Sequence, residues 1–279
     1  MKRMFHLELK NCLHRKEFKI IFLILMIISI GSFLFSCFYK GGGNQYGGSL
    51  LQVRSAFEMS MIQGPGVRII LSSIVLLIPL FSVIIFSDSY YSDCQSGVYK
   101  SILTRANQNV YVWAKSLVIL TVTFLSFLIP FLINQLLCLI AFPIKGFDNN
   151  HALPPYDIGI QNFSSEWMFD LIRLQSPLLY NLIFMILISF TASLLALFAY
   201  SAYFLVKKGR FAVISGIFLL YIISQLVVIL VGSYKFALVN LLIPGTGSFY
   251  VLLVWMSVLF ISSLIIITMK SKLEVGIED

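Results

Sequence analysis

Six long apolar runs constrain this chain more than any other feature of its sequence. None contains Asp, Glu, Lys or Arg, and they lie at residues 20–38, 69–87, 116–141, 177–206, 211–231 and 248–269. At about 1.5 Å per residue, each run is long enough to cross the roughly 30 Å apolar core of a bilayer as an α-helix. The sequence therefore predicts an all-α, polytopic membrane protein with six transmembrane helices in a single domain spanning residues 1–279.

Composition leads to the same class. Hydrophobic residues make up 59% of the 279 residues and charged residues only 11%, whereas soluble domains carry about 25% charged residues. Such a chain cannot cover itself with polar surface, which excludes soluble α/β and all-β folds. The net charge of +8 comes from basic residues placed between the apolar runs. They form no single basic patch, so we expect no nucleic-acid partner.

The distribution of basic residues predicts an orientation. Six spans place both termini on one side of the membrane, and most of the 20 Lys and Arg residues lie on that side. Because such residues favour the cytoplasmic side, we expect cytoplasmic N and C termini in a bacterial plasma membrane. Residues 1–19 are then an amphipathic helix at the inner membrane surface, with Phe5 and Leu9 on its apolar side. Residues 142–176 form an extracellular loop.

The polar segment 88–115 has a short helical pattern of its own between the second and third spans. Its residues divide between two sides, apolar Val98, Tyr99, Ile102 and Leu103 against polar Lys100, Ser101, Thr104 and Arg105. A short amphipathic helix between two spans gives a soluble protein a point of attachment from which it can move both spans. The alternative is an ordinary solvated loop.

Recognisable catalytic motifs do not occur in the sequence. It contains no Walker sequence, ABC signature, HExxH or GxSxG, and its spans lack the carboxylates of proton relays. We therefore predict no catalytic residue, no metal site and no cofactor in this chain, so any transport must use energy from elsewhere. The four cysteines form no CxxC pair. A disulfide between Cys37 and Cys138 is geometrically allowed, but two free thiols are favoured.

The layout and the polar segment together resemble the membrane (permease) subunits of ABC-2-type transporters, whose ATPase is a separate polypeptide in many bacteria. In that family an acidic residue, a Gly and an apolar helical turn follow the second span, and a basic residue and a Lys precede the third. The matching positions here are Asp93, Gly97, Val98, Tyr99, Leu103, Arg105 and Lys115. Asp93 stands where the family often has Glu, and Thr104-Arg105-Ala106 lacks the family's frequent Pro.

The resemblance implies a mechanism and partners. A coupling helix within residues 88–115 would dock in a groove of an ABC ATPase subunit that binds ATP and Mg²⁺, and the N-terminal helix would brace it. Two permease subunits, identical or different, would pair. The coupling residues would be Asp93, Gly97, Tyr99, Ile102, Leu103 and Arg105, with Tyr99, Ile102 and Leu103 as the apolar anchors in the groove.

Polar residues inside spans are candidates for a substrate path. Asn134, Gln135 and Gln225 interrupt apolar runs, where they either line a route or hydrogen-bond between helices. The expected function is export of a hydrophobic or amphipathic substrate: a peptide such as a bacteriocin, a lipid-like compound or a drug. A non-transporting membrane scaffold, sensor or immunity protein is the alternative. The fourth span also carries a stripe of small residues that permits close helix packing, at Ser189, Ala192, Ser193, Ala196 and Ala199.

Overall fold

The computed structural model of the chain is helical, as the sequence predicts. It describes residues 1–38, 52–53, 55–64, 66–104, 107–144, 147–148, 163, 165–206, 209–245 and 247–272. Six helices are long and apolar enough to cross a membrane. They are α2 (Lys16–Phe38), α3 (Arg68–Phe86), α6 (Gln108–Ala141), α8 (Pro177–Leu205), α9 (Arg210–Val231) and α11 (Phe249–Lys272).

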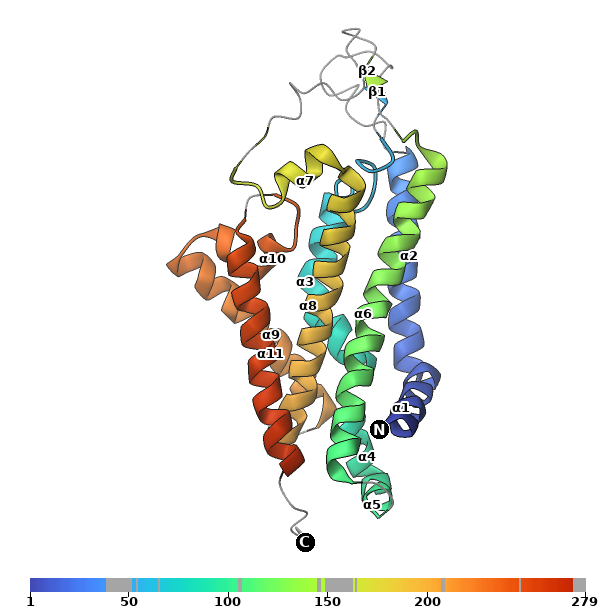
Figure 1. Ribbon diagram of the computed structural model, residues 1–279, viewed down its shortest axis with the longest axis vertical. Coiled ribbons are helices and arrows are strands. Elements are labelled where there is room, and N and C mark those ends of the chain that lie inside the picture. The colour runs from blue at the N-terminus through green and yellow to red at the C-terminus, as the bar shows by residue number, and fades with distance from the viewer. Residues whose placement is uncertain are drawn as a thin grey trace.

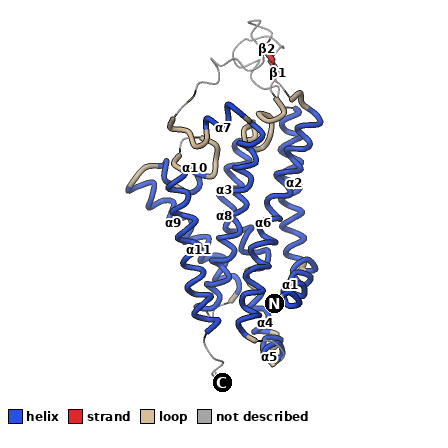
Figure 2. The backbone as a smooth tube through the Cα atoms, in the orientation of Figure 1, coloured by secondary structure: helices blue, strands red, loops and turns tan. Residues whose placement is uncertain are grey.

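The long helices run side by side along the longest axis of the molecule (Figures 1 and 2). Helix α8 packs against α6, α3 and α11, while α2 packs on α6 and α3, and α9 on α3. The helix α1 (Lys2–His14) crosses beneath α2 at the end where α11 also finishes (Figure 1). We call this the terminal end of the bundle and the opposite end the loop end. Both ends of the described chain thus lie on the same side of the spans.

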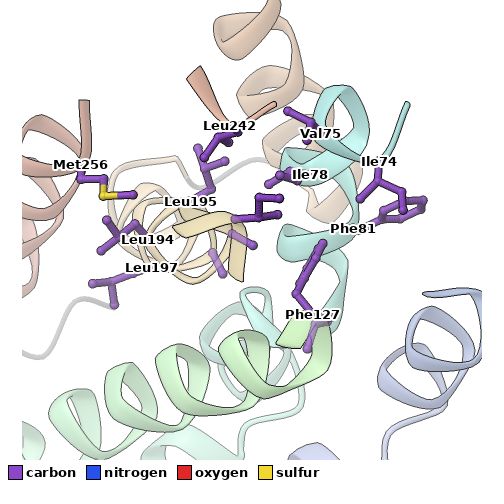
Figure 3. Packing of buried hydrophobic residues seen from close by; sticks show 14 of the residues in the cluster. Ile74, Val75, Ile78, Phe81, Phe127, Leu194, Leu195, Leu197, Leu242 and Met256 are labelled. Carbon is purple, nitrogen blue, oxygen red and sulfur yellow. The ribbon is translucent and has the colours of Figure 1, made fainter. Parts of the chain in front are cut away.

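Helix α8 is the most deeply buried span, and its sequence explains why. Ser176 accepts a hydrogen bond from the backbone N–H of Leu179 at 3.5 Å, and Pro177 opens the helix at a position that needs no donor. Its stripe of small residues is buried and lets α6 approach closely. Figure 3 shows side chains of α3, α6, α8 and α11 meeting around it, including Ile78, Phe127, Leu195 and Met256.

Several helix boundaries differ from those expected. The N-terminal helix ends at His14, because Arg15 is extended, and residues 16–19 form the first turn of α2. Its half-buried residues Phe5 and Leu9 pack against the core of this chain, and α1 rests on α6. The third span begins at Gln108 instead of residue 116. At 34 residues, α6 is about 50 Å long and extends beyond a bilayer's apolar core.

Short elements close the two ends. At the terminal end, α4 (Ser89–Gln95) and α5 (Val98–Leu103) connect α3 to α6. At the loop end lie α7 (Asp170–Gln175), the 3-10 turn η1 (Tyr234–Phe236) and α10 (Leu238–Leu241). The two-residue strands β1 (Gln52–Val53) and β2 (Phe147–Asp148) pair antiparallel there (Figure 1). Within the predicted loop 142–176, residues 145–146, 149–162 and 164 lie outside the described residues.

Candidate coupling site

The predicted coupling helix is present as α5, the second half of a small helical hairpin. Gly97 joins α4 to α5 with a φ of 73°, a left-handed conformation that costs glycine little and other residues more. At the far end of the hairpin, the side chain of Asn107 accepts a hydrogen bond from the N–H of Asn109 at 3.0 Å and caps α6. Asn107 therefore marks the start of α6.

Asp93 ties this hairpin to the membrane span that follows it. The Lys115 ammonium donates to the Asp93 carboxylate at 2.6 Å, and the Tyr111 hydroxyl donates to the same oxygen at 2.7 Å. Lys115 is 1% exposed, so its charge has lost nearly all contact with water and depends on this partner. A displacement of α4 must therefore move α6 or break a buried ion pair.

Helix α1 joins the same cluster. The Glu8 carboxylate lies 3.4 Å from the Lys115 ammonium and is itself buried. Burial raises the pKa of Glu8 above 4.5, and the Lys115 charge acts in the opposite direction. On the same side of α1, burial raises the pKa of the Cys12 thiol to about 12. Helix α1 therefore packs on α6 near the hairpin, and its role as a brace for the coupling helix stays a prediction.

A second ion cluster holds the junction of α3 and α4. Asp88 accepts from Arg15 at 2.7 Å and lies 3.0 Å from Arg210, which also donates to Glu17 at 2.9 Å. These residues come from the turn before α2, the start of α2, the α3–α4 turn and the start of α9. Charge-assisted contacts of this length are about twice as strong as neutral ones. The α4 half of the hairpin is thus held at its start, through Asp88, and near its end, through Asp93.

The two sides of α5 have different surroundings. Tyr99 packs inward, with its ring centroid 5.4 Å from that of Tyr90 and 5.5 Å from that of Tyr111, and Ile102 also contacts the core. Val98 is 46% exposed and Leu103 is half-buried. The outward surface is formed by Gly97, Val98, Lys100, Ser101 and Thr104.

The assignment of docking anchors therefore changes. Tyr99 and Ile102, expected to reach into a partner's groove, instead hold α5 against this chain, because the aromatic residues of α4 and α6 lie behind them. Val98 is the apolar residue that α5 presents outward, with Leu103 at the edge. Arg105 lies outside the described residues. The docking roles of these residues stay predictions.

The candidate path residues Asn134 and Gln135 lie in a hydrogen-bond network at the loop end. The Asn134 amide donates to the backbone oxygen of Ser29 and the hydroxyl of Ser32, both at 2.9 Å, and accepts from the N–H of Met61 at 2.8 Å. The Gln135 amide donates to the backbone oxygen of Ala56 at 3.4 Å. Both side chains hold the buried segment 55–64 against the bundle.

Asn181 of α8 completes this network, and Gln225 lies elsewhere. Asn181 donates to Gln135 at 2.8 Å and to the backbone oxygen of Phe57 at 3.0 Å. Gln225 instead accepts from the N–H of Val239 at 3.3 Å, where α9 meets α10. The structure joins two of the three predicted path residues, and the interhelical hydrogen-bonding alternative describes their contacts. Their part in a substrate path stays a prediction.

Sequence reasoning missed most of the charged residues that position the hairpin. Glu8, Arg15, Asp88 and Arg210 come from separate segments, and their pairing depends on tertiary structure. One signal for them was available in the sequence, which is their location. Because charged residues make up only 11% of the chain, carboxylates directly beside apolar runs are expected to need partners. Within the described ranges, the four cysteines are free and no group of His, Cys, Asp and Glu is placed to hold a metal.

Comparisons with known proteins leave the family open. The sequence matches no protein-family model, and no characterised protein is significantly similar to it. The chain is therefore an all-α protein with six helices suited to crossing a membrane, a helical hairpin fixed by two ion clusters at the terminal end, and a polar network at the loop end.

Proposed function

We propose that this chain is the membrane subunit of an ABC-2-type exporter, driven by a separate ATPase that docks on the outward side of α5. One observation carries the proposal: the hairpin that contains α5 is connected to a membrane span through an ion pair between half-buried Asp93 of α4 and buried Lys115 of α6. An ordinary solvated loop would leave such a lysine in water, because burial of a charge costs free energy unless a partner compensates it. A force applied to the hairpin reaches α6 because separation of the pair would leave the Lys115 charge buried without this partner, which is costly.

The location of the two ion clusters supports a role in switching. Together they connect the hairpin to α1, α2, α6 and α9. Closure of a pair of ATPases would displace the hairpin, and these contacts distribute the displacement among several spans. The terminal end is cytoplasmic in this proposal, since ATP is there and since basic residues gather on that side of the spans.

The proposed assembly contains a second membrane subunit. In α2, α9 and α11, the most apolar window is only 28%, 22% and 22% buried within this chain. These helices have faces for lipid and for a second subunit, identical or different. The substrate class is a hydrophobic or amphipathic compound, such as a peptide, that enters from the bilayer or cytosol and leaves on the loop side.

The decisive experiment is cross-linking to a soluble ABC ATPase, sought first among the products of the genes that adjoin this one. Ser101→Cys, on the outward side of α5, is placed in a cysteine-free variant and treated with a short bifunctional maleimide. We expect a covalent product with the ATPase and a change in its yield when ATP is added. Glu166→Cys, at an exposed position of the loop end, is the matched control and should give no product. If no ATPase co-purifies or cross-links, the non-transporting scaffold, sensor or immunity alternative takes its place.

A further inference from the structure

The side of α1 that faces away from this chain is basic. Its inward side holds buried Glu8 and Cys12, with half-buried Phe5 and Leu9 beside them. The exposed cations of α1 and of the first turn of α2 form what we call the basic surface, which consists of Lys2, Arg3, Lys10, Lys16 and Lys19. Contacts of α1 outside this chain therefore involve charged groups, since its apolar side is already used.

The basic surface has no acid of its own. Among the described residues, no carboxylate pairs with any of its five Lys and Arg side chains. The acids of the same two helices are engaged elsewhere, because Glu8 is buried beside Lys115 and Glu17 accepts from Arg210. Like charges gathered in one place repel one another, and a negatively charged surface relieves that repulsion.

The basic surface lies at the level where the head groups of a bilayer begin. The uncharged part of α2 starts at Ile20, directly after Lys19. At about 1.5 Å per residue, Lys16 and Lys19 are within about one turn of the apolar core. Helix α1 crosses beneath α2 at the edge of the terminal end (Figure 1). Leu7 and Leu13 of α1 are 56% and 43% exposed, which suits a helix at the boundary between head groups and acyl chains.

The chemistry and the depth together select the partner. Anionic phospholipids place fixed negative charge at this level, and each Lys or Arg near such a surface strengthens the attraction about fivefold. Exposed leucines can insert among the acyl chains beside the same head groups. A soluble acidic protein would match the cations, but the exposed leucines at this depth favour the lipid.

The inward side of α1 connects the same helix to the ion cluster of the hairpin. Glu8 lies 3.4 Å from Lys115, which also pairs with Asp93 of α4. Cys12 is 0% exposed, on the same side of the helix as Glu8. A partner that holds α1 from outside therefore also holds Glu8 in the cluster.

We propose that the basic surface binds anionic phospholipids of the adjoining leaflet, and that this binding holds α1 against α6. Phosphate oxygens accept from the Lys and Arg side chains outside, while Glu8 and Cys12 stay packed inside. The contact requires neither the ATPase nor the transport function proposed above, so it can be tested on this chain alone.

Native mass spectrometry of the full chain in a nonionic detergent tests the lipid contact. The probes are phosphatidylglycerol, phosphatidylcholine and free glycerol phosphate. We expect phosphatidylglycerol to be retained more strongly than phosphatidylcholine, and free glycerol phosphate least. Lys2→Gln/Lys10→Gln should weaken retention of phosphatidylglycerol about tenfold or more, at about fivefold for each cation. Lys2→Arg/Lys10→Arg keeps both charges and should retain the lipid as the wild type does.

Cys12 reports whether the bound lipid holds α1 in place. In a variant that keeps only this cysteine, maleimide reaches the buried thiol only when α1 separates from the bundle. Labelling should be several-fold slower in nanodiscs that contain phosphatidylglycerol than in nanodiscs of phosphatidylcholine alone. The difference should disappear in about 1 M salt, where the Debye length falls to about 3 Å. Lys2→Gln/Lys10→Gln should remove it at low salt.

The matched control is Arg68→Gln/Lys235→Gln, which removes two cations at the loop end. It should leave the labelling of Cys12 and its dependence on phosphatidylglycerol unchanged. Equal labelling in the two kinds of nanodisc overturns the proposal and leaves an acidic protein as the partner of the basic surface. Protection of Cys12 by free glycerol phosphate overturns the lipid as the source of the phosphate. Unchanged retention of phosphatidylglycerol by Lys2→Gln/Lys10→Gln overturns the assignment to these residues.

Discussion

The ammonium of Lys115 lies 2.6 Å from the carboxylate of Asp93, and the lysine is 1% exposed. One residue belongs to a membrane-spanning helix and the other to the hairpin before it. Both residues have other polar residues near them in the sequence. Among the described contacts, this is the ion pair that joins α4 to α6. This ion pair attaches the hairpin to the spanning bundle, and mutation of either residue tests its contribution.

Lys115→Met should lower the free energy of unfolding by about 3 kcal/mol or more, because Glu8 and Asp93 then remain as neighbouring carboxylates with no cation between them. Chemical unfolding in detergent measures the change. Lys235→Met is the matched control: its ammonium is exposed and pairs with Glu166 at the loop end, so its loss should leave the free energy of unfolding nearly unchanged. Equal losses in the two variants would show that the Lys115 pair has no special role.

Glu8→Gln should stabilise the protein at neutral pH. Burial raises the pKa of Glu8 above 4.5 despite Lys115, and the other charges that act on it are Asp93 and Arg15. A raised pKa means that protonated Glu8 contributes stability below pH 4.5, which is lost as pH rises through the folded-state pKa. Gln keeps the neutral form at every pH. Its advantage over the wild type, measured from unfolding midpoints, should therefore shrink to nothing as pH falls to 4.5.

A wild type that is more stable than Glu8→Gln at neutral pH would contradict this reasoning. It would mean that the attraction to Lys115 outweighs the desolvation of the carboxylate. Lys115→Met then provides the next comparison, since removal of the attraction should raise the pKa of Glu8 further and steepen the loss of stability with rising pH.

Asn134→Leu should release segment 55–64. The substitution removes the acceptor of the Met61 N–H and the donor to Ser29, at a cost of about 2 kcal/mol or more. Cys138 is 0% exposed and contacts the backbone oxygen of Met59 at 3.6 Å, so it reports on the segment. In a variant that keeps only this cysteine, maleimide should label it faster after Asn134→Leu.

Asn240→Leu is the control for that measurement. Asn240 donates a hydrogen bond to the backbone oxygen of Tyr234 at 2.7 Å and lies in α10, outside the network around Cys138. Its substitution should leave the labelling rate unchanged. Faster labelling after both substitutions would indicate a general loosening of the loop end in place of local release.

The two sides of α5 should respond oppositely to the same substitution. Val98→Asp changes an outward residue, 46% exposed, and should leave stability nearly unchanged while it abolishes association with the proposed ATPase and stimulation of its activity. Ile102→Asp places a charge against the core and should destabilise the protein itself. Unfolding and pull-down of both variants separate the effects. Normal ATPase stimulation by Val98→Asp would contradict docking on this side of α5.

The sequence by itself determined the class and most of the layout of this protein. Runs of about twenty apolar residues leave the backbone one economical way to satisfy its hydrogen bonds in a bilayer, which is a helix. The number and order of the spans, the short helix at α5 and the close packing of α8 follow from such local rules. The small-residue stripe of α8, the Gly in the hairpin turn and the Asn that caps α6 can be recognised in the sequence without knowing which residues they contact.

Only the tertiary structure decided which residues meet. Glu8, Asp93 and Lys115 are far apart along the chain, and their pairing depends on α1 turning back against α6. The packing of Tyr99 and Ile102 against this chain came only from the structure, because a helical pattern shows that two sides differ but not which side meets the protein. Asn134 and Gln135 contact a loop segment that no periodicity reveals. Ion pairs and amide hydrogen bonds form only when two groups lie at the right distance and orientation. Between distant segments, that distance and orientation are set by packing of the whole bundle.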